Sequence, residues 1–505
     1  MMYSGTKIAR DGSLVPLFMD GTPMHSLYAP ERDARAFASQ FGHECGFAIV
    51  GGAGNCMHIA ALQRARPDMR ILCVEESEED VLFIQSHFSV PHGVALCTAW
   101  KLEPEISQRY VPALHGNIEF HAVRSWAAHA SSMLAAQNAI SAALRRFSAD
   151  YSVQAHFGAQ WHRNILLNMR HCMTHGSRWR ETLLGAARKK MTAAVIAAGP
   201  SLDHSAAELT RGRGSYFIIA ADTAWRALAR RGIRCDAVVS VDGQLLSGAH
   251  FAPFGIPERN DFCKDCIFVF DLSASHDAVK RARRLGGQIA FSHNSHPLSV
   301  LAAQSCGSLV PLETGAGTVT IAAAALAVAA GFETVRMFGA DFSYGDGKAY
   351  TSGTYLHDLY SARQHRLHTL ESQFAALMLR TPLLTRSGVA TTEVLQGYRA
   401  SLEDFMRRNM YARDGARMRN AGAGRSLKEE PRTDSGDFCT EYPARLRKAI
   451  ASFKDGSLDF MQSAELRSLL PLLAALRARL KNPSLYRLLQ LAYSRTLRYT
   501  VKETQ

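Results

Sequence analysis

Three apolar segments in the middle of the chain stop at an aspartate, a residue type that can accept hydrogen bonds from a ligand. The three aspartates are Asp222, Asp242 and Asp341. Short apolar runs that alternate with polar turns and helices are typical of a parallel sheet. Because ligands of open parallel sheets bind at the carboxyl ends of the strands, the sequence predicts a binding crevice that these carboxylates line.

A second element of the predicted site is the turn that follows the apolar run 195–198. Gly199 and Pro200 force a tight turn, and Ser201 adds a hydroxyl beside the free amides of the turn and of the next helix. Free amides at a helix N-terminus form an anion site, here suited to a phosphate. The alternative is a strand-to-helix turn in which Ser201 only caps the helix.

The aspartates themselves allow two interpretations. Asp222, which precedes Thr223, can accept hydrogen bonds from ribose hydroxyls or from a base amine, and Asp242 ends the next strand in the same way. Either aspartate alone would most often begin or cap a helix. Two of them at adjacent strand ends, beside a phosphate-binding turn, favour the ligand-binding interpretation.

A glycine-rich turn with the sequence ETGAGTVT opens a later helix of small side chains, which is expected to lie very close to the sheet. Gly315 and Gly317 let the backbone approach a nucleotide, and Thr314 and Thr318 can donate hydrogen bonds to it. The strand after this helix ends at Asp341. The loop that follows is aromatic and contains Tyr344, Lys348, Tyr350 and Tyr355.

The length of 505 residues is too great for one hydrophobic core and corresponds to about three domains. We predict an α/β protein whose central domain is Rossmann-like, with a mostly parallel sheet and helices on both faces. The predicted parts are an N-terminal α/β domain at 1–165, the central domain at 166–410, a linker at 411–440 and a C-terminal helical domain at 441–505.

The N-terminal domain has a glycine turn of its own, GGAGN, between two apolar runs. The second run ends at Glu75, and an acidic residue at about that distance from the turn can bind a ribose. Because the motif lacks the full GxGxxG pattern, a close contact between helix and strand is the simpler explanation. A helical segment with Trp161, Asn164 and Asn168 at helical spacing bridges to the central domain.

Composition limits the classes of function. The net charge of +13 favours acidic ligands such as nucleotides, but the basic residues are not interleaved with aromatic ones, so no nucleic-acid partner is expected. We see neither a signal peptide nor an apolar run that could span a bilayer, and we expect a cytoplasmic protein. The ten cysteines are expected to be reduced, and the pair Cys263 and Cys266 is a weak signal for a metal or redox site.

The chain resembles the motility-associated-factor (Maf) glycosyltransferases of flagellated bacteria in four segments that occur in the same order: GPSL, ADT, SVDGQ and TGAGTVTIAAAALAVAAGFETVRMFGADFSY. The resemblance is strong over about 190–360. That family shares its central, MptE-like domain with archaeal hydroxymethyldihydropterin pyrophosphokinase. Its pattern is also similar to that of the bacterial sialyltransferases that use CMP-sialic acid.

The resemblance implies transfer of a nonulosonic, sialic-acid-like sugar from a CMP donor to serine or threonine hydroxyls of flagellin. The nucleotide sugar is then a donor substrate, and we expect no tightly bound cofactor and no metal ion. The resemblance further implies that 199–201 and 314–318 hold the nucleotide phosphate, while Asp222 and Asp242 fix the ribose and the cytosine.

The general base is the point at which this sequence departs from the family. Members often carry a histidine shortly after the GxD strand, whereas the corresponding stretch here reads GDGKAYTSGTY. His357 is the nearest substitute and is our predicted base, with Tyr344 or Tyr355 as hydrogen-bond donor to the leaving oxygen. His293 and His296, at another predicted strand end, are the alternative bases.

Other functions fit the same residues. A pyrophosphokinase would bind magnesium and ATP through the strand-end acids, which are Asp222, Asp242, Asp271 and Asp341. A protein that has kept the fold and lost the chemistry would bind flagellin as an assembly factor. A methyltransferase would use the GGAGN turn for its cofactor. The three enzymes differ in what they release or bind. The glycosyltransferase releases CMP, the pyrophosphokinase depends on magnesium and releases AMP, and the methyltransferase binds S-adenosylmethionine.

Overall fold

The computed structural model describes residues 1–172, 178–189, 191–252, 262–306, 309–312, 318–386, 388–412, 417–420 and 437–500. The chain forms two compact units, Met1–Ala159 with Leu470–Ala492, and Gln160–Leu469 with Tyr493–Gln505. The boundary falls inside the long helix α7 (Met133–Cys172). The C-terminal helical region contributes segments to both units, and much of the predicted linker lies outside the described residues.

The first unit combines a hairpin, β1–β2, with a parallel sheet in the order β5-β4-β3-β6. The strands are β1 (Tyr3–Ile8), β2 (Leu14–Phe18), β3 (Cys45–Gly51), β4 (Arg70–Glu75), β5 (Ala95–Thr98) and β6 (Asn117–Ala122). The helices are α1 (Pro30–Ala38), α2 (Met57–Ala65), α3 (Glu78–His87), η1 (Ala99–Lys101), α4 (Leu102–Arg109), α5 (Pro112–His115), α6 (Arg124–His129), the start of α7, α19 (Leu470–Arg477) and the start of α20 (Leu485–Thr500).

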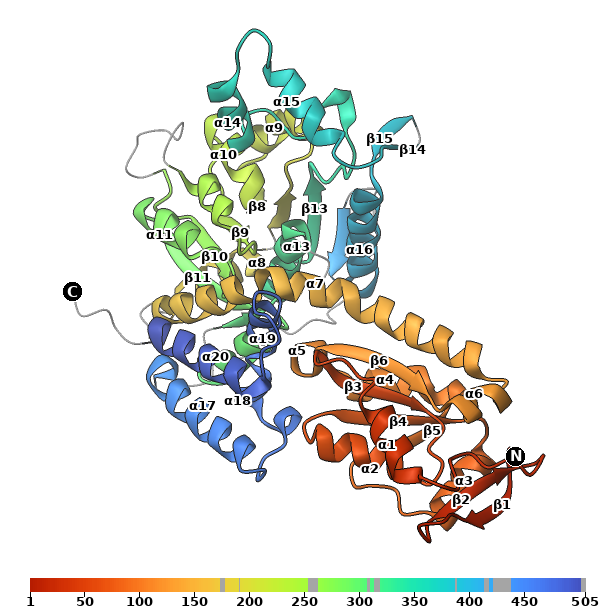
Figure 1. Cartoon of the computed structure of the whole chain (residues 1–505). Coiled ribbons are helices and arrows are strands. Elements are labelled where there is room, and N and C mark those ends of the chain that lie inside the picture. Colours follow the sequence, from red (N-terminus) through yellow and green to blue (C-terminus); the bar gives the residue numbers. More distant parts are fainter. Residues whose placement is uncertain are drawn as a thin grey trace. The chain divides into compact units, whose positions relative to one another are not determined.

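The second unit is built on a sheet in the order β12-β11-β10-β9-β8-β7-β13-β17-β16 (Figure 1). Its strands are β7 (Thr192–Ile196), β8 (Tyr216–Ala221), β9 (Ala237–Ser240), β10 (Ile267–Asp271), β11 (Gln288–His293), β12 (Val310–Pro311), β13 (Thr334–Phe338), β16 (Met410–Ala412) and β17 (Arg417–Asn420), beside a separate hairpin of β14 (Leu384–Arg386) and β15 (Val389–Thr391). The strands from β12 to β13 are parallel, and β17 and β16 add an antiparallel edge.

Helices and short 3₁₀ segments connect these strands. They are α8 (Arg178–Arg188), α9 (Leu202–Arg211), α10 (Asp222–Arg230), η2 (Leu245–Phe251), α11 (His276–Arg284), α12 (Pro297–Ala303), α13 (Val319–Ala330), η3 (Gly345–Gly347), α14 (Tyr355–Arg363), α15 (Leu370–Met378), α16 (Glu393–Asn409), α17 (Phe438–Lys454), η4 (Phe460–Gln462) and α18 (Ala464–Arg467).

Helices cover both faces of the parallel strands. Side chains of α8, α13 and α16 pack with Ile267 and Val269 of β10 in one buried cluster. Phe268 alternates with these residues and therefore points to the opposite face, where Trp225 of α10 packs against it with ring centroids 5.6 Å apart. All residues of β8 and of β10 are buried, as expected for strands covered on both sides. The predicted fold class is confirmed.

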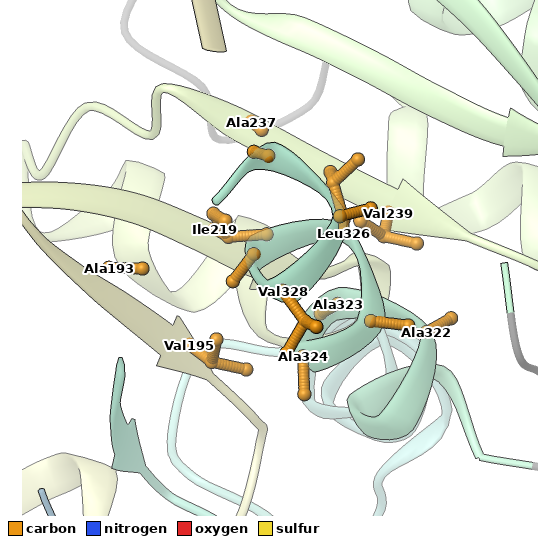
Figure 2. Packing of buried hydrophobic residues seen from close by; sticks show 14 of the residues in the cluster. Ala193, Val195, Ile219, Ala237, Val239, Ala322, Ala323, Ala324, Leu326 and Val328 are labelled. Atoms are coloured by element: carbon orange, nitrogen blue, oxygen red, sulfur yellow. The ribbon is translucent and has the colours of Figure 1, made fainter. Parts of the chain in front are cut away.

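The helix of small residues packs directly on the sheet, as the sequence predicted. In α13 all residues after the first are buried. Figure 2 shows Ala323, Leu326 and Val328 against side chains of β7, β8 and β9. Although α13 is almost entirely apolar, neither it nor another helix in the described ranges has the length and hydropathy needed to cross a membrane.

The order of the strands contains one reversal. The chain adds β8 to β12 successively on one side of β7 and then returns to place β13 on the other side of β7. In open α/β sheets, ligands bind at the carboxyl ends of the strands where the order reverses in this way. The topology therefore directs attention to the residues that follow β7 and β13.

Enlarging a side chain between α13 and the sheet should destabilise the second unit. We expect Ala323→Leu to lower its free energy of unfolding by about 1–3 kcal/mol, because Ala323 is fully buried and the added carbons must displace close neighbours. Urea unfolding followed by circular dichroism measures the change. Ala400→Leu on the exposed face of α16 is the matched control and should change stability by less than about 0.5 kcal/mol. Equal effects of the two substitutions would contradict the packing argument.

Candidate functional site at the switch between β7 and β13

The backbone that leaves β7 stays paired with the backbone that leaves β13. The Gly199 amide donates to the Gly339 carbonyl at 2.8 Å. A Cβ atom on Gly199 would overlap that carbonyl and the Asp341 carboxylate, and a Cβ atom on Gly339 would overlap the Ala197 carbonyl. Gly339 also has a φ of 65°, in the left-handed region. This close approach of two chain segments requires glycine at both positions.

Asp341 lies directly against the turn that the sequence assigned to a phosphate. Its Oδ2 accepts a hydrogen bond from the Ser201 amide at 2.8 Å, and its Oδ1 accepts one from the Ser201 hydroxyl at 2.5 Å. The Ser201 side chain does not cap α9. Because the carboxylate uses both donors, a phosphate at this turn would have to displace Asp341 or bind against a like charge. The turn and Asp341 form one unit.

The next two strand ends carry the other predicted aspartates. Asp222 is buried at the start of α10, where it accepts hydrogen bonds from the Thr223 amide at 2.7 Å and from the Ser240 hydroxyl at 2.6 Å. Asp242 is partly exposed and accepts one from the Gln244 amide at 2.9 Å. β8 and β9 are neighbours, so both aspartates lie at the same edge as Ser201. Asp242 is the more accessible of the two to a ligand.

Helix α7 covers the strand ends farther from the switch. Asn164 donates to the Gly243 carbonyl at 3.0 Å after β9. Asn168 donates to the Leu272 carbonyl at 2.9 Å and to the Ala274 carbonyl at 2.8 Å after β10. The helical spacing noted in the sequence therefore places two amide side chains on one face of α7, and they bind loop carbonyls of the crevice. Helix α7 therefore lies at the ends of β9 and β10.

Asp271 is enclosed at the end of β10. Its Oδ1 accepts hydrogen bonds from the Ser273 amide and hydroxyl at 2.8 and 2.6 Å and from Asn294 at 3.2 Å. Burial raises the pKa of Asp271 to about 6, although the Ser273 donors oppose this shift. Across the described residues, no three His, Cys, Asp or Glu side chains are grouped so that they could hold a metal ion.

The aromatic loop after β13 reaches the strand ends of β8 and β9. Burial is the main cause that raises the pKa of Tyr355, and the charges of Tyr360, Asp222 and Asp242 add to it. The Tyr355 ring packs edge-on against His250 of η2, the segment after β9, with centroids 4.5 Å apart. Burial also raises the pKa of Tyr344, whose amide donates to the Ala390 carbonyl of β15 at 2.8 Å.

Asp203 ties this loop to α9, a role that sequence reasoning missed. Its Oδ1 accepts hydrogen bonds from Thr351 at 2.5 Å and from Arg231 at 2.6 Å, and its Oδ2 pairs with Lys348 at 3.1 Å. Burial alone would raise the pKa of Asp203, but donors from Thr351, Lys348 and Ser352 hold it at about 2. Asp203 directly follows the GPSL segment, and this position could have drawn attention to it. Only the turn of that segment was interpreted from the sequence.

Two further arginines of α10 hold α14 in place. Arg226 and Arg230 pair with Asp358 of α14 at 2.7 and 2.5 Å. Together with Asp203 and Arg231, these ion pairs fasten the loop from both sides of Tyr355. We call Asp203, Asp358, Lys348 and the α10 arginines Arg226, Arg230 and Arg231 the clamp. The sequence showed these arginines only as basic residues of a helix, without indicating their partners.

Two of the histidines predicted as bases make ring contacts with residues other than Tyr355: His296 packs against Trp161, with centroids 6.0 Å apart. The ring contact of His357 is with Phe374 of α15, at 6.3 Å between centroids, so His357 faces α15. His296 accepts a hydrogen bond from the Leu298 amide at the start of α12, and burial lowers its pKa to about 4. His293 ends β11. No observation brings His357 to the strand ends, and its role as base stays a prediction.

The glycine-rich turn before α13 is only partly described. Thr314, Gly315 and Gly317 lie outside the described residues, so their predicted roles stay predictions. Thr318 is the N-cap of α13, and its hydroxyl accepts a hydrogen bond from the Thr320 amide at 3.3 Å. The helix leads into β13, and a crossover helix runs opposite to its strands, so Thr318 lies on the carboxyl edge of the sheet.

The comparisons with known proteins match the part of the chain that contains these residues. A family model described as 6-hydroxymethylpterin diphosphokinase MptE-like matches residues 163–347, which include both Ser201 and Asp341. An uncharacterized protein of Treponema pallidum (strain Nichols) is 31% identical over 237 residues, which make up 46% of this chain and 75% of the relative. The chain belongs to the MptE-like family. The MptE-like domain predicted from the sequence is confirmed.

Two further proteins are similar to this chain. A second uncharacterized Treponema pallidum (strain Nichols) protein is 34% identical to the MptE-like chain over 174 residues, which are 33% of this chain and 77% of the relative. A solved structure titled "Structure of MAf glycosyltransferase from Magnetospirillum magneticum AMB-1" is similar over 99% of this chain and 86% of that chain. Its sequence identity is 15% and its TM-score 0.39, a similarity too low to bear on function.

The glycine turn of the first unit, outside the MptE-like match, is filled by the chain itself. Glu75 accepts hydrogen bonds from the Ala53 amide at 2.6 Å and from Tyr3 and Trp126 at 3.0 Å each. A Cβ atom on Gly52 would overlap Trp126. The acid that could have bound a ribose is thus fully buried and engaged, which supports the structural interpretation of the GGAGN turn.

Removing the charge of Asp203 should loosen the aromatic loop of the MptE-like domain. We expect Asp203→Asn to lower the free energy of unfolding of the second unit by about 2 kcal/mol, because it weakens hydrogen bonds to a charged group. Hydrogen exchange should become faster at the Thr351 and Ser352 amides. Asp346→Asn is the control, since Asp346 is exposed and pairs only with the exposed His204 among the described residues. Unchanged exchange in Asp203→Asn would refute the clamp.

The buried Glu75 should make stability depend on pH. Burial raises its pKa to about 7, so the folded state holds its proton to a higher pH than the unfolded state does. Stability should therefore fall as pH rises from about 4.5 to about 7, by on the order of 3 kcal/mol. Thermal unfolding at pH 5 and pH 8 measures the change. Glu75→Gln should reduce the difference in stability between the two pH values, whereas Glu44→Gln, at an exposed position, should leave that difference unchanged. Equal pH slopes in both variants would argue against the assignment.

Proposed function

We propose that this MptE-like protein is a glycosyltransferase that moves a nonulosonic, sialic-acid-like sugar from a CMP donor to serine or threonine hydroxyls of flagellin. The order of the GPSL, ADT, SVDGQ and GAD segments supports the donor class, since it resembles the Maf glycosyltransferases. The match of residues 163–347 to the family model supports a nucleotide-dependent reaction in this domain. The acceptor rests on the sequence resemblance alone.

One observation carries the proposal: Ser201 and Asp341, from segments 140 positions apart, are hydrogen-bonded at the strand-order reversal. A carboxylate that is fixed by two donors and partly exposed can accept hydrogen bonds from the hydroxyls of a nucleoside. Asp242 offers a second acceptor along the same edge, and its charge acts on Tyr355. This arrangement fits a nucleoside that lies across the ends of β13, β7, β8 and β9.

The reaction requires three events at this edge. The bond between the anomeric carbon and the phosphate oxygen breaks, and its electron pair leaves with CMP. The acceptor hydroxyl oxygen attacks the anomeric carbon from the opposite face, which inverts the configuration. The hydroxyl proton passes to a base, for which His357 stays the prediction. Tyr355 would donate a hydrogen bond to the departing phosphate oxygen, where negative charge develops.

A pyrophosphokinase is the second candidate, because the matching family model is described as a diphosphokinase. That reaction would transfer a diphosphate from ATP and release AMP, and it would need magnesium at the strand-end acids. The described residues show Asp222 and Asp271 buried and engaged in hydrogen bonds, which leaves Asp242 and Asp341 for a cation. Because one or two carboxylates are enough to hold Mg²⁺ together with substrate phosphates, the preference for the glycosyltransferase rests on the sequence resemblance.

Selective binding of CMP is the expected result when the full chain is tested against CMP, CDP, ADP and GTP by thermal unfolding. A ligand present at about one hundred times its Kd stabilises the folded state by about 2.7 kcal/mol. We expect CMP to raise the Tm most and Asp341→Asn to weaken CMP binding at least about tenfold, because the variant loses a charged acceptor. Asp346→Asn in the same loop is the control. Preference for ADP, with AMP release that EDTA abolishes, would establish the kinase instead.

A further inference from the structure

The start of α14 contains a polar group that lacks a partner. Thr354 is the N-cap of this helix, but its side chain makes no capping hydrogen bond. The residue is fully buried, and Oγ1 has no hydrogen-bond partner among the described residues. An N-cap hydroxyl normally accepts a hydrogen bond from an amide of the first turn. Here the His357 amide donates to the Thr354 carbonyl at 3.1 Å instead, and the Thr354 hydroxyl remains available.

A second buried polar group without a partner lies beside the first turn of the same helix. His250, at the end of η2, packs edge-on against the Tyr355 ring with centroids 4.5 Å apart. His250 is 7% exposed, and its Nδ1 has no hydrogen-bond partner in the described part of the chain. Buried polar atoms are almost always paired. Two exceptions from different elements next to Tyr355 indicate a ligand or water that both would contact.

The clamp places positive charge on the α10 side of this helix start. It sets four cationic side chains against two carboxylates, and Asp222 and Asp242 on the other side of Tyr355 offset the excess. A Cβ atom on Gly353 would lie 3.2 Å from Arg230 Cδ, so the start of α14 rests on the arginine face of α10. Asp222 and Asp242 also act on Tyr355, and they suit the hydroxyl-bearing part of a ligand rather than its anionic part.

We propose that the N-terminus of α14 is the subsite for the phosphate of the nucleotide, with Thr354, His250 and the first amides of the helix as hydrogen-bond donors. This inference rests on the proposed function, and it moves the phosphate away from the turn at Gly199 to Ser201. That turn already holds the Asp341 carboxylate. Helix N-termini bind phosphate through their amides and the helix dipole, and Tyr355 then stands beside the phosphate oxygen that leaves the sugar.

The decisive experiment compares CMP with cytidine by calorimetry on the full-length chain. The wild-type protein should bind CMP at least about tenfold more tightly than cytidine, because only CMP reaches the subsite. Thr354→Val and His250→Phe should each weaken CMP binding about tenfold and leave cytidine binding unchanged. Thr354→Ser keeps the hydroxyl and should restore the binding of CMP.

Thr369→Val is the matched control for Thr354→Val. Thr369 is also a helix N-cap, at α15, but its hydroxyl accepts a hydrogen bond from the Ser372 amide at 3.3 Å. We expect Thr369→Val to leave the ratio of CMP to cytidine affinity unchanged. Circular dichroism and the Tm of each variant show whether it folds. If Thr354→Val does not fold, the ratio of CMP to cytidine affinity is measured in Thr354→Ser and Thr354→Asn instead. We expect Thr354→Asn to weaken the binding of CMP and to leave the binding of cytidine unchanged.

Several results would overturn the inference. Unchanged CMP affinity in Thr354→Val and His250→Phe would do so, and so would equal weakening of CMP and cytidine, which indicates a structural role. If wild-type protein binds neither compound, the proposed function fails and inorganic phosphate becomes the probe. If the wild-type protein then binds phosphate and Thr354→Val does not, the result would still support an anion site at α14. If both proteins bind phosphate, or if neither does, the anion site would be refuted.

Discussion

The close approach of the backbone after β7 to the backbone after β13 is the constraint on which the rest of the candidate site depends. Because Gly199 and Gly339 carry no side chain, the two segments stay hydrogen-bonded beyond the ends of their strands. This contact brings Ser201 to Asp341 and turns a potential anion site into a fixed carboxylate. The position of that carboxylate decides which part of a nucleotide the turn can accept, since like charges so close together are unfavourable.

A second set of interactions fixes the loop that follows this carboxylate in the chain. Asp203 in the first turn of α9 pairs with Arg231, the C-cap of α10, and Asp358 in the first turn of α14 pairs with Arg226 and Arg230 of α10. The segment with Tyr350 and Tyr355 is therefore held at both ends by charged hydrogen bonds, which are stronger than those between neutral groups. Preorganised donors stabilise developing charge without the cost of reorientation during the reaction, so a fixed loop suits group transfer.

The two glycine turns of this chain show that a motif does not by itself make a binding site. In the first unit, Tyr3 and Trp126 lie opposite the GGAGN turn and bind Glu75, so the turn serves packing. In the second unit, the side chain opposite the GPSL turn is the partly exposed Asp341. Both turns follow a buried parallel strand and lead into a helix. They differ in what the tertiary fold places in front of them, and this determines whether a ligand can reach the turn.

The sequence by itself determined the parallel α/β architecture, the small-residue helix α13 and the strand ends at Asp222, Asp242 and Asp341, because these follow from local hydrophobic pattern and from the size of side chains. It also predicted the membership in the MptE-like family through the order of its motifs. Only the tertiary structure decided which strand-end acids are buried, that Asp341 uses the donors of Ser201, that Asp203 binds Thr351, and that His250 packs against Tyr355. These relations join residues far apart in the chain, and hydrogen bonding and burial between such residues leave no periodic signal in the sequence.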